Sequence, residues 1–394
     1  MMTGVSGRLS IKARPKTKPA APVKLQIVDL LRSFSILSVM AAHFVYVPPP
    51  DPAYGWWWYH FQKNGAYGVG VFFVVSGFLI TRLIDGQGKG LFSPSFKTFY
   101  ARRVARIFPL FFLTILLGLA AAYLLPRAMP RFNYCFLADP GQFNFLFWSS
   151  LFTFSFNWYC ALSAGKLIAV AWGVMWSLSV EEQFYIFYPL LLKRLGRAGP
   201  YLAFLSAMVV LGPLWRFAMG RLSPSYSEWG KFGSFGSFDQ IAFGALLYFV
   251  AKKYGPFLGL RPRLCALACL SGVALLALAY LGTDTYDHRS EDVVGASCVA
   301  LGSFLLLLGG LHLRFFQSAF WAPLAWPGKY SYGIYLLHIF VFYFSYPLLI
   351  AHGDLLTAYV LFVLISTGVA ALCYHFFEAP ANLAVRRAFG LKAA

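Results

Sequence analysis

The sequence predicts an all-α polytopic membrane protein with about ten transmembrane helices and both termini in the cytoplasm. Of its 394 residues, 59% are hydrophobic and only 12% are charged, and the mean hydropathy is +0.64. Soluble domains carry about 25% charged residues. Apolar runs long enough to cross a bilayer, which takes about 20 residues of helix, follow one another without a long polar insert. The third observation is the uneven placement of lysine and arginine along the chain.

The apolar runs define ten spans. Their approximate limits are 27–47, 67–84, 107–126, 177–195, 199–217, 236–252, 263–282, 293–311, 330–349 and 355–377.

The distribution of lysine and arginine decides whether an eleventh apolar stretch, "FNFLFWSSLFTFSFNWYCALSA" at 143–164, also spans the membrane. With ten spans and a cytoplasmic N-terminus, most of the 33 lysines and arginines lie in cytoplasmic loops. An eleventh span would move the later basic loops "KRLGR" and "KKYG" to the outside, against the positive-inside rule. We therefore expect 143–164 to form a short extracytoplasmic aromatic helix or a re-entrant segment.

The predicted domain organisation is simple. Residues 1–24 are basic and Pro-rich and lack the apolar core of a signal peptide, so we expect a disordered cytoplasmic leader. Residues 25–380 form one integral membrane domain, and 381–394 a basic cytoplasmic tail. The net charge of +19 resides mostly in short loops, which indicates membrane topology and a lipid partner, not nucleic acid.

The six cysteines show no C-x-x-C pair and no metal-ligand spacing with histidine, so no metal site is expected. Cys135 and Cys160 could share an extracytoplasmic loop. A disulfide between them stays open, because connectivity does not follow from sequence.

Two polar residues interrupt the first span. Arg32 and His43 are eleven residues apart, which on a helix is three turns plus about 20° and a rise of about 16 Å, so they point in nearly the same direction at different depths. Asp29 precedes Arg32 by three residues, close enough to pair with it. A charge at mid-bilayer costs about 2.5–3.5 kcal/mol, so these residues are expected to face the protein interior. The alternative is an ion pair at the membrane edge with His43 at the far interface.

The next polar features lie around the first inside loop. "GVGVFFVVSGFLITRLI" carries small residues that permit close helix contact, and its Ser76 could also let a ligand approach the backbone. "FYARRVARIFP" places Arg103 and Arg106 on one helix face, where their planar forks could grip one polyphosphate group together. The alternative for Arg82, Arg102 and these two is ordinary membrane anchoring by positive charge.

Two further segments carry polar side chains within predicted spans. "WSLSVEEQFYIFYP" contains Glu181 and Glu182, which cannot both face lipid and which could orient a histidine or act in proton transfer. "YSYGIYLLH" puts Ser331, Tyr335 and His338 on one face. The alternatives are an interfacial helix start for the acids and a structural role for the histidine. The terminal "FEAP" is interpreted as a helix stop.

Together these motifs resemble the membrane-bound acyltransferase-3 family. They occur in the order of that family and cover most of residues 25–380. The resemblance implies ten core spans in a bacterial cytoplasmic (inner) membrane and transfer of an acyl group, commonly acetyl, from cytoplasmic acyl-CoA to a hydroxyl of a carbohydrate or glycolipid acceptor, usually across the membrane. No esterase-like domain follows the membrane core, so we expect the single-domain form.

The resemblance also assigns roles to the residues. His43 is the expected catalytic centre, as a general base or a covalent acyl carrier, with Glu181 or Glu182 orienting it. Acetyl-CoA is the expected co-substrate. It would be bound by Arg103 and Arg106, with help from Arg32, Ser76, Arg82 and Arg102, while the substrate contacts are assigned to Trp176, Ser177, Tyr185, Tyr335 and His338.

Several alternatives stay open. The acceptor could be lipopolysaccharide, an exopolysaccharide, a lipid-linked sugar or a secondary metabolite, and a homodimer is compatible with the sequence. A proton-coupled secondary transporter of a small polar or anionic solute would also place Arg, His and Glu inside a bundle. It leaves the arginine cluster without a task, and no repeated halves are visible. A scaffold protein explains none of the intramembrane charges.

Overall fold

The structure is a computed structural model that describes residues 25–44, 55–87, 90–128, 143–163, 170–222, 224–283, 291–350 and 355–391. Within these ranges the regular elements are all helices, and no strand is present. The prediction of an all-α fold is therefore confirmed. The predicted leader, residues 1–24, lies outside the described ranges.

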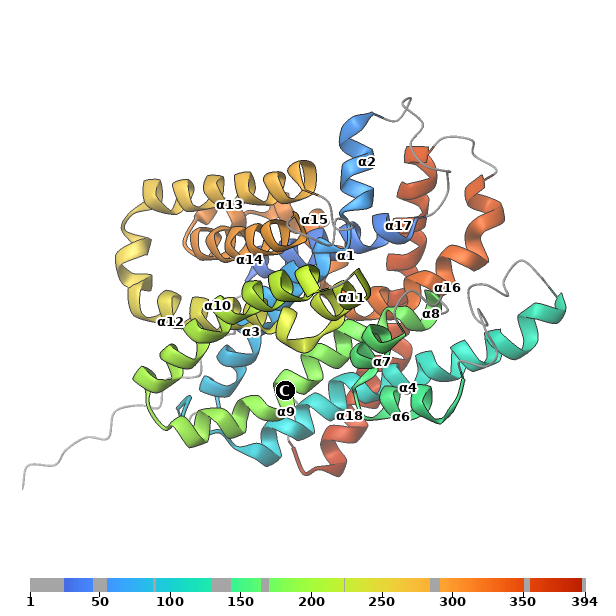
Figure 1. Cartoon of the computed structure of the whole chain (residues 1–394), viewed down its shortest axis with the longest axis horizontal. Helices are drawn as coiled ribbons and strands as arrows, with labels where there is room; N and C mark the ends of the chain where they lie inside the picture. Colours follow the sequence, from blue (N-terminus) through green and yellow to red (C-terminus); the bar gives the residue numbers. More distant parts are fainter. Residues whose placement is uncertain are drawn as a thin grey trace, which may run out of the picture.

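Each of the ten predicted spans coincides with one long helix of the described chain. These helices, of 18 residues or more, are α1 (Gln26–His43), α3 (Tyr67–Asp85), α4 (Phe96–Ala128), α9 (Met175–Leu195), α10 (Ala198–Leu222), α12 (Phe238–Gly259), α13 (Pro262–Gly282), α14 (Glu291–Gly310), α16 (Ser331–Ile350) and α17 (Leu355–Cys373) (Figure 1).

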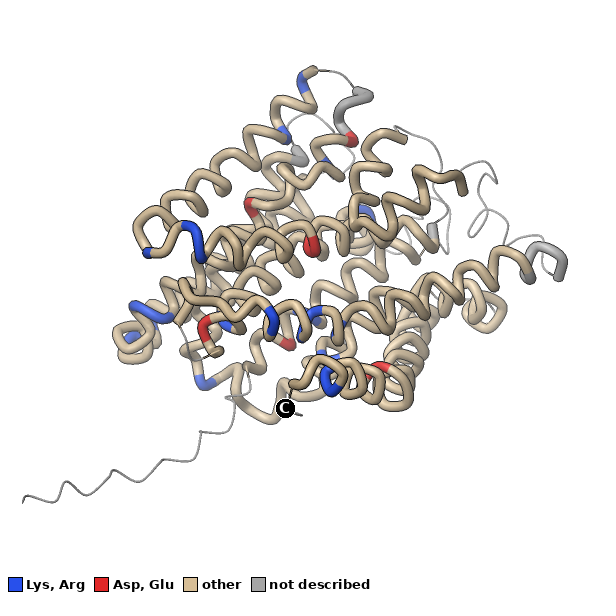
Figure 2. The backbone as a smooth tube through the Cα atoms, turned by 90° about the horizontal axis from the view of Figure 1, so that it is seen from below, with Lys and Arg blue, Asp and Glu red and all other residues tan. Residues whose placement is uncertain are grey.

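Seven stretches of the described chain are long and apolar enough to cross a membrane. They include all of the long helices except α1, α9 and α12. The charged side chains are few, and nearly all of the backbone in Figure 2 is tan. The chain is an integral membrane protein. The exact number of crossings and the side of each terminus stay predictions.

The aromatic stretch 143–164 forms two short helices, α6 (Phe145–Phe152) and α7 (Phe156–Leu162), neither long enough to span a bilayer. Phe154 joins them with a φ of 54°, in the left-handed region that a bulky residue rarely adopts. Gln183 of α9 donates a hydrogen bond of 2.6 Å to the Phe154 carbonyl. This bond holds the turn against α9, so the segment belongs to the packed bundle.

The interpretation of "FEAP" as a helix stop is wrong. A π-helical segment, η7 (Tyr374–Glu378), connects α17 directly to α18 (Ala379–Ala388). Pro380 lies in the first turn of α18, directly after the π-helical segment, and the chain stays helical across it. The helix therefore runs past residue 380, through part of the predicted tail.

Helix α3 lies at the centre of the fold and contacts α1, α9, α12 and α14. Its crossing with α12 is made by two glycines. A Cβ on Gly77 would overlap the carbonyl oxygen of Ile241, and one on Gly244 would overlap that of Val74. The small residues of this segment therefore permit close helix contact, as the sequence predicts.

A buried ion pair connects α10 to α12. The two terminal nitrogens of Arg216 donate to the two carboxylate oxygens of Asp239, at 3.0 and 2.9 Å, and Nη1 also donates to the Gly236 carbonyl. Both side chains are at most 3% exposed. The fork geometry satisfies the carboxylate at a position where an unpaired charge would be costly.

The remaining helices are short. They are α2 (Trp56–Lys63), α8 (Val170–Gly173), α11 (Pro224–Phe232) and α15 (Ala322–Lys329), with 3₁₀ turns at Ser234–Gly236, Arg314–Gln317 and Ala319–Trp321. Cys160 is a buried free thiol on α7, and Cys135 lies outside the described residues, so the pairing between them is untested.

The glycine crossing predicts a position-dependent effect of alanine. Gly77→Ala and Gly244→Ala should each destabilise the protein by about 1–3 kcal/mol through overpacking, despite the better helix propensity of alanine. Gly368→Ala on α17 is the control, because a Cβ there meets no atom within 4 Å. Thermal unfolding in detergent measures the difference, and equal midpoints for the three variants would contradict the packing described here.

The buried ion pair predicts a second contrast. Asp239→Ala should cost about 3–5 kcal/mol, because it removes the carboxylate that faces the buried Arg216 charge. Lys252→Ala is the matched control. It removes an ion pair of 2.6 Å with Asp85 in which the lysine is 60% exposed, and such surface pairs contribute about 0–1 kcal/mol. Similar losses of thermal stability in the two variants would refute the distinction.

Candidate functional site

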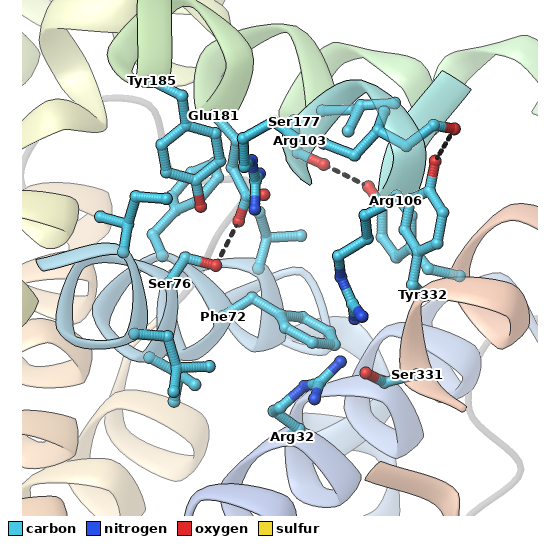
Figure 3. A pocket seen from close by; sticks show the side chains of 18 of the residues that line it. Arg32, Phe72, Ser76, Arg103, Arg106, Ser177, Glu181, Tyr185, Ser331 and Tyr332 are labelled. Atoms are coloured by element: carbon cyan, nitrogen blue, oxygen red, sulfur yellow. Dashed lines mark hydrogen bonds between the residues drawn. The ribbon is translucent and has the colours of Figure 1, made fainter. Parts of the chain in front are cut away.

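A cavity of about 370 Å³, the main cavity, lies between α1, α3, α4, α9 and α16. Its volume falls within the range of about 300–1,000 Å³ that is usual for small-molecule sites. Apolar side chains of α3 form much of its wall. The polar side chains around it are Arg32, Ser76, Arg103, Arg106, Ser177, Glu181, Tyr185, Ser331, Tyr332 and Tyr335 (Figure 3).

Arg103 contacts two side chains of α9 at the cavity wall. Its Nη2 lies 3.0 Å from Oε1 of Glu182, and its guanidinium stacks on the ring of Tyr185 at 3.9 Å from the ring centre. Both partners come from α9, so the contact fastens α4 to α9. The ion pair and the ring together compensate the charge of Arg103 in a medium of low dielectric constant.

Arg32 of α1 and Arg106 of α4, the arginine pair, extend their guanidinium groups into the same part of the main cavity (Figure 3). Among the described residues neither guanidinium forms a hydrogen bond or an ion pair, and the ion pair expected between Arg32 and Asp29 is not formed. The two charges repel each other. An anion bound between them would remove that repulsion.

A hydroxyl group lies beside the arginine pair. Ser331 is fully buried, and its Oγ has no hydrogen-bond partner within the described chain. Figure 3 shows it next to Arg32 at the cavity edge. A buried polar group without a partner is uncommon in native structures, so the two cations and this donor together form a site suited to an oxyanion.

The acidic pair of α9 is divided between two partners. Ser76 of α3 donates a hydrogen bond of 2.7 Å to Glu181 at the cavity wall, and Glu182 accepts from Arg103. Within the described structure neither carboxylate contacts His43. The expected orientation of the imidazole by Glu181 or Glu182 is therefore not found in the geometry.

The imidazole of His43 contacts His338 instead. Nδ1 of His43 lies 3.2 Å from Nε2 of His338 and 3.0 Å from the Val39 carbonyl oxygen. His338 is fully buried, and its Nδ1 lies 3.0 and 2.8 Å from the carbonyl oxygens of Ile334 and Tyr335. We call these two residues the histidine pair.

Tyr335 connects the histidine pair to the main cavity. Its ring lies 6.2 Å from that of His338 and forms part of the cavity wall. Its hydroxyl donates to the Val174 carbonyl at 2.8 Å and accepts from Ser177 at 2.5 Å. These bonds fix the ring, so the boundary between the cavity and the histidines is rigid.

The remaining site residues predicted from the sequence lie outside the main cavity. Arg82 and Arg102 do not line it. Trp176 borders a second cavity of about 60 Å³, which also contains Lys231 of α11 and shares Val69 and Phe73 with the main cavity. Of the predicted acyl-donor residues, the structure brings together Arg32, Ser76, Arg103 and Arg106.

Two features escaped the sequence reasoning. The carboxylate of Glu378, in the π-helical segment, interacts electrostatically with both members of the arginine pair. The acidic residue of the "FEAP" motif was the sequence signal for it, but the proline two positions later suggested the end of a helix. The contact between His43 and His338, 295 positions apart, has no signal in local spacing.

Comparison with known proteins gives the following matches. A family model described as an acyltransferase domain, Acyl_transf_3, matches residues 25–375. The chain is 27% identical over 385 residues to YrhL of Bacillus subtilis, whose name gives it as a candidate peptidoglycan O-acetyltransferase, with 92% of this chain and 55% of the relative covered. It is 24% identical over 368 residues to the peptidoglycan O-acetyltransferase OatA of Listeria monocytogenes, covering 90% and 55%.

The chain thus spans about half the length of these relatives. No solved structure matches it. The family model covers nearly the whole described helical bundle, including both the arginine pair and the histidine pair. The chain belongs to the acyltransferase-3 family.

Proposed function

We propose that this acyltransferase moves an acyl group, most simply acetyl, from cytoplasmic acyl-CoA to a hydroxyl of a cell-surface carbohydrate or glycoconjugate. The observation that carries the proposal is the arginine pair with Ser331 in the main cavity. Within the described part of the chain, these two guanidinium groups have no hydrogen bond or ion pair and the hydroxyl has no partner, a combination that suits the phosphates of coenzyme A.

The size of the main cavity supports a donor that enters only in part. A volume of about 370 Å³ is near the lower limit for ligand sites, which suits an acylated pantetheine arm with a phosphate at its entrance. The arginine pair and the histidine pair also lie at different depths. Arg32 and His43 are separated by eleven residues of helix α1, a rise of about 16 Å. A donor with its phosphate at Arg32 therefore needs a long arm to bring its thioester to His43.

The chemistry proposed at His43 has two routes. In the direct route, His43 takes the proton of the acceptor hydroxyl as its oxygen attacks the thioester carbonyl, and then gives that proton to the departing thiolate of CoA. In the covalent route the imidazole takes the acyl group as the thiolate of CoA leaves, and the acceptor oxygen then displaces the imidazole, releasing the proton that the thiolate takes up. Both routes transfer one acyl group and leave CoA as the thiol.

The proposed acceptor is a hydroxyl of a cell-envelope glycan. The names of the two bacterial relatives, which give one as a peptidoglycan O-acetyltransferase and the other as a candidate for that activity, support this choice. Among such acceptors peptidoglycan sugars are the first to test, and lipopolysaccharide and other glycans follow. The acceptor would approach from the side of the second cavity, where Trp176 could stack on a sugar ring. With the predicted cytoplasmic termini, the acceptor would then lie on the outer side of a bacterial cytoplasmic membrane, opposite to the donor.

The transporter alternative is not favoured, because the chain belongs to an acyltransferase family. It differs from our proposal in one measurable property. A transporter would move its solute across vesicles that contain no acyl-CoA, whereas an acyltransferase in the same vesicles would not.

The proposed role of the arginine pair predicts that its substitution weakens binding of the acyl donor. Arg32→Gln and Arg106→Gln should each weaken acetyl-CoA binding by about 10- to 100-fold, because each removes a charge-assisted hydrogen bond worth about 1.5–3 kcal/mol. Binding of labelled acetyl-CoA to purified protein in nanodiscs measures this. Arg194→Gln is the matched control, because Arg194 is an exposed cation at the end of α9.

The donor assignment fails if folded wild-type protein does not bind acetyl-CoA, or if the control weakens binding as much as the cavity variants do. Free phosphate and adenosine diphosphate serve as competitors. Competition by the diphosphate alone would support recognition of the nucleotide end at the arginine pair.

The proposed role of His43 predicts that its substitution lowers turnover. His43→Gln should lower the rate of CoA release from acetyl-CoA by about 10²- to 10⁴-fold, the usual contribution of a general base, while donor binding changes little. Intact-mass measurement after exposure to acetyl-CoA separates the two routes, since only the covalent route adds one acetyl group that disappears in the variant. Unchanged CoA release by His43→Gln would remove His43 from the chemistry.

A further inference from the structure

The contacts of His338 determine where its proton lies. Nδ1 of His338 lies within hydrogen-bond distance of two carbonyl oxygens, those of Ile334 and Tyr335. A carbonyl oxygen only accepts, so Nδ1 must carry the hydrogen. A neutral imidazole has one N–H, and Nε2 of His338 therefore presents a lone pair. The opposite tautomer would direct a lone pair at two carbonyl oxygens.

The lone pair of His338 in turn determines which ring nitrogen of His43 carries the hydrogen. Nδ1 of His43 faces that lone pair at 3.2 Å and the Val39 carbonyl oxygen at 3.0 Å. Both neighbours are acceptors, so the hydrogen of neutral His43 lies on Nδ1 and is shared between them. Nε2 of His43 is then the unprotonated nitrogen, and it takes no hydrogen bond from any described residue.

We infer that His338 is a positioning residue that holds His43 in the Nδ1–H tautomer and leaves Nε2 of His43 as the reactive nitrogen. This inference rests on the proposed function, and it replaces the substrate-binding role expected for His338. It holds for both routes, because the base and the acyl carrier need the same free nitrogen. Glu181 and Glu182 are not required for it, since both are bonded to other groups.

The proton balance follows from this arrangement. In the direct route, the acceptor proton moves to Nε2 of His43 and later to the CoA sulfur, while the Nδ1 hydrogen remains in place. During this time His43 is an imidazolium, which Val39 and His338 stabilise as neutral acceptors. The carbonyl oxygens beyond His338 take up no proton, so the network orients His43 and carries no proton away. Lys231 also acts electrostatically on His43, and its charge disfavours the imidazolium.

Magnetic resonance of the full-length protein, labelled with ¹⁵N and ¹³C at its seven histidines, tests the tautomer directly. The two neutral tautomers of imidazole differ in their nitrogen and ring-carbon shifts, and the His43→Gln variant identifies the signals of His43. We expect the Nδ1–H form at His43 in the wild type above neutral pH. The Nε2–H form there would overturn the inference. This readout needs no turnover, so it decides the inference even if the proposed function fails.

Two substitutions test the consequence for catalysis. His338→Leu removes the acceptor at similar size, and we expect kcat to fall by roughly 10²-fold with the affinity for acetyl-CoA unchanged. His338→Gln places an amide oxygen near the position of Nε2, and we expect it to restore the rate to within about tenfold of the wild type and to keep the Nδ1–H signal. Equal rates in wild type and His338→Leu, or equal losses in the two variants with loss of donor binding, would refute the positioning role.

Discussion

Arg103 of α4 and Glu182 of α9 form an ion pair of 3.0 Å inside a helical bundle. Charged side chains on the outer surface of this bundle would face lipid, which is unfavourable. The pair joins two walls of the main cavity and leaves Arg106, one turn further along α4, directed into the interior. Helix α1 supplies Arg32 from the opposite side. The bundle can enclose these three arginines because one is neutralised by a carboxylate and a ring, while the other two share a cavity large enough for a ligand.

The interior of the protein separates two kinds of chemistry. The arginine pair provides positive charge without a base, and the histidine pair provides a base whose hydrogen-bond contacts are neutral groups. Tyr335 stands between them, held by Ser177 and the Val174 carbonyl and in contact with the ring of Phe72. In the proposed function, a donor bound through its charge at the arginine pair would react at His43, away from the two arginine cations that would make the imidazole a poorer base.

The long helices could be predicted from the sequence because a bilayer-spanning run depends only on its own composition. The same holds for Arg32, Ser76 and Glu181, whose polarity inside apolar runs reveals them, whereas Arg106 is revealed by its spacing from Arg103 in a basic loop. Their partners could not be predicted, because pairing depends on how helices pack. Adjacency in sequence suggested that Arg103 and Arg106 act together, yet Arg103 pairs with Glu182 and Arg106 lies with Arg32. Glu378 was obscured by Pro380, since a proline in the first turn of a helix and one after a helix end give the same sequence pattern.

The glycine crossing of α3 and α12 also has a consequence for motion. Backbones that touch without intervening side chains cannot slide by a residue, because the next Cβ would meet a carbonyl oxygen. Helix α3 forms one wall of the main cavity. We therefore expect this wall to keep its position relative to α12. Whatever binds against this wall must fit a cavity whose walls stay in place. A two-carbon group on a thin flexible arm meets that requirement, whereas a bulky solute that needs the helices to part does not.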